Sequence, residues 1–198
     1  SVSLTKMNKV KLRSKTVRDI YLNISHFLDH FIMLIFAKAA YDAGRHFDLT
    51  YDEIMVYGTL SFLFFGAFAP LASFLAAKFS RASLMVMYHF GLAVASIAAG
   101  TSSSLFVLSA SLAVIGIFAS IYHPVGTAML LAKNEKMGLR LGINGVYGNM
   151  GVAAAPLVLG AILLFGDWRF CFIIPGIFCL MYGLSLIHIS EPTRQSSI

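Results

Sequence analysis

Hydrophobic residues dominate four long stretches of the chain, and none of these stretches contains Asp, Glu, Lys or Arg. They cover residues 54–77, 82–132, 141–166 and 170–190. An α-helix rises about 1.5 Å per residue, so roughly 20 apolar residues cross a hydrocarbon core of about 30 Å. The stretch 82–132 is too long for one crossing, and the turn-forming residues 100–104 divide it in two. With an amino-terminal helix, the pattern predicts six membrane spans, near residues 20–41, 54–77, 83–100, 104–131, 141–165 and 168–189.

Composition and run length together define the fold class. Hydrophobic residues make up 58% of the chain and charged residues 12%, with a mean hydropathy of +0.79. Soluble domains carry about a quarter charged residues, so a soluble fold is excluded. Backbone groups in lipid must be hydrogen-bonded internally, and barrel strands would give short alternating segments instead of long runs. We therefore predict an all-α integral membrane protein, a bundle of six transmembrane helices that occupies residues 19–183.

The charged residues lie mainly in loops, and the loops alternate in character. The loops assigned to the inside hold Lys6, Lys9, Lys11, Arg13, Lys15, Arg18, Lys78, Arg81, Lys133, Lys136 and Arg140. The opposite loops hold Arg45 and Arg169 among acidic residues. The positive-inside rule then places the basic segment 1–18, and with it the N-terminus, in the cytoplasm, as expected for a multi-pass inner-membrane protein. The net charge of +6 reflects topology and contact with the lipid bilayer, and we expect no nucleic acid as a partner.

The last residues differ in character from the spans. The stretch from Leu184 to Arg194 resembles the in-frame translation of a sequencing adapter. We therefore expect residues 184–198 to be a non-native tail, in which His188 and Glu191 carry no function.

Polar residues inside a span are costly, and they usually face a cavity or another helix. The first span is the richest in them, with Asp19, Asn23, His26 and His30 on one face of a helix and Asp29 at the flank of that face. Asp29 lies about 14 Å into the predicted span, close to the bilayer centre. A carboxyl group and imidazoles at that depth could take up and release protons, so we predict a proton-coupling site at Asp29, His26 and His30. The alternative for each histidine is a hydrogen bond to a neighbouring helix.

The fourth span contains Tyr122-His123-Pro124. Proline has no N–H to donate, so this segment predicts a break in the helix, and broken spans often line a substrate site. We place Tyr122 and His123 among the solute-binding candidates, with a purely structural kink as the alternative. Tyr88 and His89, early in the third span, are expected to pack at the membrane interface.

The fifth span is crowded with glycine, alanine and one proline. Gly151 and Ala155 form a small-xxx-small step that lets two helix backbones approach closely. Asn144 and Asn149 are its polar exceptions, and either could face a cavity or bond another helix. Together with Asn23 of the first span they complete the predicted solute-binding set.

Other classes of function find less support in the residues. The nucleophile motif of an intramembrane serine protease and the clustered aspartates of a metal-dependent transferase are both missing from the sequence, so a membrane-embedded enzyme is only an alternative. His26 and His30 at i, i+4 could bind a metal, but no third ligand is evident along the sequence. We therefore predict no metal site and no cofactor.

These features together resemble one family. The six spans, the short basic loop after the second span, the fifth span rich in glycine and proline, and Asp167-Trp168-Arg169 resemble the amino-terminal half of a major facilitator superfamily transporter. The segments from His26 to His30 and from Tyr122 to Pro124 resemble its fosmidomycin-resistance-like and sugar-transporter-like branches. The resemblance covers the chain from Met7 to about Gly183.

Two family signatures are partly retained. The loop signature is a Gly, three residues, Asp-Arg, one residue and Gly-Arg-Arg, and it maps onto residues 73–82 with its basic positions at Lys78 and Arg81 but without its aspartate. The resemblance implies that this is a gating loop. Half of the antiporter signature of the fifth span is present, at Gly151, Ala155-Pro156 and Gly160, which favours antiport.

The resemblance implies a secondary active transporter of twelve spans. Its two halves, each an inverted pair of three-span units, would alternate access to a site at the membrane centre. The expected partners are a small organic solute, protons as coupling ions, and a second six-span half that this chain lacks. We expect the chain alone not to transport, and a six-span half-transporter that dimerises is a further alternative.

Overall fold

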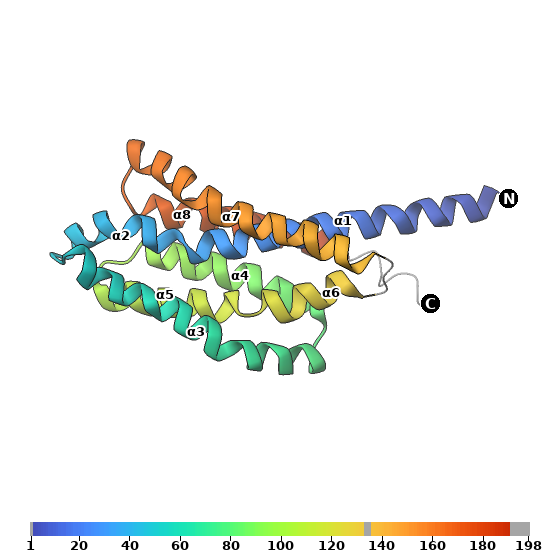
Figure 1. The fold of residues 1–198 in the computed structure, drawn as a ribbon, viewed down its shortest axis with the longest axis horizontal. Helices are drawn as coiled ribbons and strands as arrows, with labels where there is room; N and C mark the ends of the chain where they lie inside the picture. The colour runs from blue at the N-terminus through green and yellow to red at the C-terminus, as the bar shows by residue number, and fades with distance from the viewer. Residues whose placement is uncertain (1, 133–135, 191–198) are drawn as a thin grey trace.

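The computed structural model describes residues 2–132 and 136–190, and its regular elements there are all helical. The helices are α1 (Val2–Met33), α2 (Ile35–His46), α3 (Tyr51–Lys78), α4 (Arg81–Gly100), α5 (Leu105–Ala119), the π-helix η1 (Tyr122–Gly126), α6 (Thr127–Leu131), α7 (Met137–Phe165) and α8 (Phe170–Ser190). They lie side by side along the long axis of the molecule (Figure 1). The predicted all-α membrane bundle is confirmed.

Five helical segments are long and apolar enough to cross a membrane: Thr16–His46, Tyr51–Lys78, Arg81–Gly100, Leu105–Leu131 and Met137–Phe165. The sixth predicted span corresponds to α8, of which Phe170–Ser185 forms a shorter apolar helix. The first span is interrupted at Leu34, whose N–H donates to the carbonyl of Phe31 over three residues instead of four. Residues 184–190 continue α8, while residue 1 and residues 191–198 lie outside the described part, so the non-native tail stays a prediction.

The helices pair in a pattern that relates the first three spans to the last three. The most extensive contacts join α1 to α7, α3 to α5, and α4 to α8. Spans one to six begin with α1, α3, α4, α5, α7 and α8. If the first three spans are exchanged in order with the last three, the α1–α7 pair becomes the α5–α3 pair. The α4–α8 pair maps onto itself. This pairing is the one expected for a three-plus-three repeat.

A glycine brings the backbones together in both of the related pairs. A Cβ atom added at Gly151 of α7 would collide with the carbonyl group of Phe27 on α1, and one at Gly116 of α5 would collide with the carbonyl group of Ser61 on α3. Close approach of this kind is the usual role of small residues between membrane helices. The packing role predicted for Gly151 is confirmed, and Ala155, one turn further along α7, is buried as well.

The fourth span is broken where proline predicts it. Helix α5 ends at Ala119, and the π-helix η1 contains Tyr122, His123 and Pro124 before α6 continues the span. The N–H of Val125 still donates to the carbonyl of Ile121, at 3.2 Å, so helical hydrogen bonding continues on the far side of the proline. Short π-helical segments within longer helices are frequent at functional sites.

Candidate functional site

Polar residues from three elements meet inside the bundle. Helix α1 supplies most of them, η1 supplies two and α7 supplies one. We call this set the polar cluster; it consists of Asn23, His26, Asp29, His30, Tyr122, His123 and Asn144. The members on α1 are three or four residues apart, which places neighbours on one side of a helix. Of the predicted site residues, only Asn149 and the two basic loop residues lie outside it.

Three histidines form the centre of the polar cluster. Nε2 of His26 lies 3.1 Å from Nε2 of His30, one turn along α1. The ring of His123 lies 5.2 Å from that of His26 and 5.7 Å from that of His30, measured between centroids. One ring nitrogen from each of the three lies within 4.8 Å of the others. A third possible metal ligand, which was not evident along the sequence, therefore comes from another span.

Asp29 is the most deeply buried charged residue of the polar cluster. Its side chain is 1% exposed, and Oδ2 lies 3.6 Å from Nε2 of His123, whose side chain is 43% exposed. Oδ1 has no hydrogen-bond partner among the described residues. Within the span Thr16–His46, Asp29 stands about 20 Å from one end and about 26 Å from the other. A carboxylate buried this way must be protonated or face a cation.

Hydrogen bonds fix the orientation of His26. Its Nδ1 lies 2.8 Å from the carbonyl oxygen of Asn144, and since a carbonyl only accepts, Nδ1 carries the proton. Nε2 of a neutral His26 is then an acceptor, and its lone pair faces Nε2 of His30 at 3.1 Å. The ring of Tyr122 stacks on His26 at 4.8 Å, and a Cβ added at Gly148 would lie 2.7 Å from Cε1 of His26. The predicted hydrogen bond to a neighbouring helix is present at Nδ1 of His26, and Nε2 faces the polar cluster. A role of His26 in proton coupling stays a prediction.

Tyr122, Asn144 and Asn23 form a second layer of the polar cluster. The hydroxyl of Tyr122 donates to the carbonyl of Leu22 at 2.8 Å and lies within hydrogen-bond distance of the Asn144 amide. Nδ2 of Asn144 donates to Oδ1 of Asn23 at 2.9 Å. These bonds join all three elements, so the position of η1 relative to α1 and α7 is well defined.

Asn149 does not join this network. It is exposed on α7, whereas Asn144 is buried. Five residues along a helix correspond to a rotation of about 140° around the axis, so the two side chains face different sides. The grouping of Asn149 with Asn144 in one site is not supported by their positions.

The basic loop residues lie at the end of the bundle, away from the polar cluster. Nζ of Lys78 sits over the ring of Phe74, 4.3 Å from its centroid. Nη1 of Arg81 donates to the carbonyl of Ala128 on α6 at 3.4 Å. Arg81 thus links the start of α4 to the second part of the broken fourth span.

An ion pair that the sequence did not indicate joins α1 to α7. Nε of Arg140 donates to Oδ2 of Asp19 at 3.0 Å, and Nη2 of Arg140 bonds to Oδ1 of Asp19. Along the sequence, Arg140 indicates only the topology of the chain. The available signal was an acid and a base at the ends of two spans on the same predicted side of the membrane.

Tyr88 and His89 occupy the core, so the expectation of interfacial packing was wrong. Both are 0% exposed. Nε2 of His89 lies 3.0 Å from the hydroxyl of Ser25, and the hydroxyl of Tyr88 donates to the backbone carbonyl of Ser25 at 3.0 Å. The rings of Tyr21 and Tyr182 flank His89 edge-on. Partners on α1 thus satisfy the hydroxyl of Tyr88 and Nε2 of His89, while Nδ1 of His89 has no hydrogen-bond partner among the described residues.

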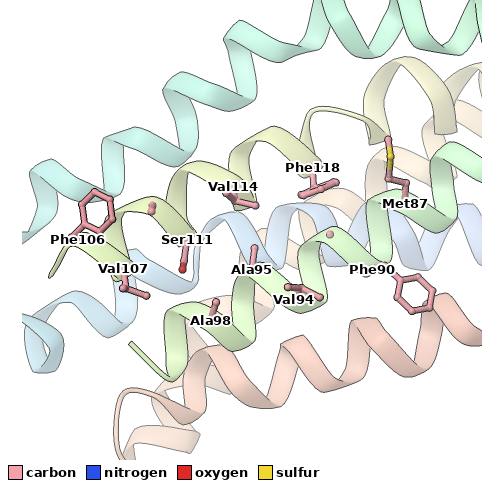
Figure 2. Close-up of a pocket in the computed structure, with 12 residues that line it drawn as sticks. Met87, Phe90, Val94, Ala95, Ala98, Phe106, Val107, Ser111, Val114 and Phe118 are labelled. Atoms are coloured by element: carbon pink, nitrogen blue, oxygen red, sulfur yellow. The ribbon is translucent and has the colours of Figure 1, made fainter. Parts of the chain in front are cut away.

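An apolar groove of about 550 Å³ runs between α4 and α5 (Figure 2). Met87, Phe90, Val94 and Phe118 are among its lining residues, and Ser111 contributes its one hydroxyl group. Such a lining suits a hydrocarbon chain and offers almost no hydrogen bonds to a polar solute. The polar cluster, not this groove, is the candidate site for solute and protons.

The fold and the polar cluster define a multi-pass membrane protein with ionisable groups in its interior, an arrangement typical of transporters. The family model described as Major Facilitator Superfamily matches residues 22–198. The chain therefore belongs to the major facilitator superfamily, whose members are membrane transporters of small solutes and not enzymes. A comparison with curated proteins finds no match.

Proposed function

We propose that this chain forms the amino-terminal half of a proton-coupled transporter of a small organic solute in the inner membrane, with its N-terminus in the cytoplasm. Asp29 is the coupling acid, and His26 and His30 exchange protons with it. Asn23, Tyr122, His123 and Asn144 line the solute site. The contact between buried Asp29 and half-exposed His123 carries this proposal.

The exposure of the two partners suggests the order of proton transfer. His123 reaches the surface of the chain, whereas Asp29 is almost completely enclosed, and their nearest polar atoms are 3.6 Å apart. A proton taken up by His123 can pass to Asp29 over one short step, and burial favours the neutral form of the acid. Loss of that proton leaves a charge at the membrane centre, which a change of conformation or a bound solute must compensate.

Three features support alternating access. The π-helix η1 places Tyr122 and His123 at a break that can bend without rupturing the span. The Asp19–Arg140 ion pair and the bond from Arg81 to Ala128 connect helix ends on the predicted cytoplasmic side. Such contacts can form in one state of the transporter and open in the other. The second six-span half would face the exposed parts of α3 and α7.

The decisive experiment compares Asp29→Asn with Asp48→Asn in the full-length protein reconstituted into vesicles. Asp48 is exposed in a loop at φ 56°, a conformation that Asn tolerates well, so it is a matched control. The probes are fosmidomycin and labelled glucose, chosen for the two branches that the sequence resembles, with and without an imposed pH gradient.

We expect the pH gradient to drive transport of one probe by the parent protein and by Asp48→Asn. Asp29→Asn should lose this response while still exchanging the solute across the membrane without a gradient. A fully proton-driven Asp29→Asn protein would reject Asp29 as the coupling acid.

A further inference from the structure

We propose that His26, His30 and His123 bind one divalent transition-metal ion of the Zn²⁺ class, with Asp29 beside them as the compensating negative charge. These three residues are called the histidine cluster. The proposal goes beyond the transport function, because metal binding requires neither a solute nor a proton gradient.

The spacing of the nitrogen atoms fits a metal ion. Two nitrogen ligands about 2.0–2.1 Å from a tetrahedral Zn²⁺ lie roughly 3.3 Å apart. The Nε2 atoms of His26 and His30 are 3.1 Å apart, and a nitrogen of His123 lies within 4.8 Å of both. An inward movement of His123 by about 1.5 Å would complete a three-histidine site. His123 is half-exposed, so its side chain has room to move and leaves an entry path.

The surroundings prepare His26 as a ligand. A metal-binding histidine usually donates its second ring N–H to a carbonyl or carboxylate, which fixes the ring and its tautomer. Nδ1 of His26 makes this bond to the carbonyl of Asn144, and the Tyr122 ring stacks against the imidazole. Gly148 leaves the space that the ring occupies, because any larger residue there would meet it. Nε2 of His26 is therefore oriented toward His30 before any metal arrives.

Charge balance also favours a cation. Asp29 is buried with Oδ1 unpartnered among the described residues, and its other oxygen faces His123. Three neutral imidazoles add no charge, so a divalent ion would supply the positive charge that a buried carboxylate needs. Imidazole ligands select Zn²⁺, Cu²⁺, Ni²⁺ or Co²⁺ over Mg²⁺ and Ca²⁺, which prefer oxygen.

The test is metal binding to the purified full-length protein in detergent, carrying an affinity tag that contains no histidine. Co²⁺ is titrated as a spectroscopic substitute for Zn²⁺, and bound Zn²⁺ is measured after dialysis. We expect one ion per chain and visible absorption bands of Co²⁺ with nitrogen ligands. His123→Ala and His30→Ala should each weaken binding by at least about tenfold. His46→Ala is the matched control, because His46 is an exposed histidine outside the histidine cluster.

Folding of each variant is checked by helical circular dichroism. If His30→Ala fails to fold, the test can still be made with His123→Ala, because a half-exposed side chain is less important for folding. Equal affinities of the parent protein, His123→Ala and His46→Ala would overturn the proposal, and so would the absence of Co²⁺ bands. The two proposals can fail independently. If the protein binds metal but Asp29→Asn retains proton-driven transport, only the proposed coupling role is rejected. If the protein binds no metal but Asp29→Asn loses proton-driven transport, only the metal site is rejected.

Discussion

Two histidine environments lie within the same bundle and differ in almost every respect. His89 is fully enclosed by tyrosine rings and makes one side-chain hydrogen bond, to Ser25. The histidine cluster combines three imidazoles from two spans with a carboxylate, and one of its rings reaches the surface. A position within a membrane-spanning helix is therefore a poor guide to the role of a histidine. The residues around a histidine determine whether it serves packing or can bind a proton or a metal ion.

The physical difference lies in what each environment can stabilise. The Tyr88, Tyr21 and Tyr182 rings around His89 offer packing but no negative charge, so a neutral imidazole is the stable form. Asp29 beside His123 can balance a positive charge, whether a proton or a metal ion supplies it. We expect substitutions at His89 to affect stability and those in the histidine cluster to affect function.

The largest expected effect is on stability, at His89. His89→Ala removes a fully buried ring and its hydrogen bond to Ser25, whose hydroxyl keeps its bond to the carbonyl of Tyr21. We expect the free energy of unfolding to fall by about 2–4 kcal/mol. His123→Ala should lower it by less than His89→Ala does, because the side chain of His123 is 43% exposed whereas His89 is fully buried. Unfolding is followed in detergent with a metal chelator present. A larger loss for His123→Ala than for His89→Ala would reverse the comparison.

Gly148 tests whether the histidine cluster depends on a fixed position of His26. In Gly148→Ala the new methyl group would meet the imidazole, which should cost about 1–3 kcal/mol and lower the affinity for Co²⁺. Gly145→Ala is the control, since a Cβ there has no atom within 4 Å, and it should leave both quantities unchanged or raise stability slightly. Identical Co²⁺ affinities in the two variants would show that the ring tolerates displacement.

The smallest expected effect concerns two tyrosine hydroxyls. Tyr122→Phe loses the bond to Leu22 and the contact with Asn144, whereas Tyr88→Phe loses the bond to Ser25. Hydrogen bonds between membrane helices contribute about 0.6 kcal/mol on average, so both variants should lose a similar, small amount of stability. Transport of the solute probe should fall more in Tyr122→Phe than in Tyr88→Phe, because Tyr122 belongs to the proposed solute site whereas Tyr88 borders it. An equal fall in both variants would argue against a separate role for the polar cluster.

The fold was largely predictable because membrane spans depend on run length and charge, which are local properties of the sequence. The spans over α3, α4 and α7 lie close to their predicted ranges, and the break at Pro124 follows from a missing N–H group. The turn at Leu34 was not predicted, since neither proline nor glycine marks it.

The candidate site was only partly predictable. Helical spacing grouped Asn23, His26, Asp29 and His30 correctly because they share one helix. Asn149 was grouped with Asn144 on composition alone, although a rotation of about 140° separates them. The Asp19–Arg140 ion pair depends on contact between two spans, which sequence distance does not reveal.

The sequence by itself determined that this chain is a bundle of membrane-spanning helices, because hydrophobic run length suffices for that conclusion. From the helical rise it also predicts that Asp29 lies near the membrane centre. Only the tertiary structure decided that His123 of the broken span meets Asp29 and the His26–His30 pair, and that His89 does not. Helix packing sets these distances, and it depends on where glycines allow two backbones to touch.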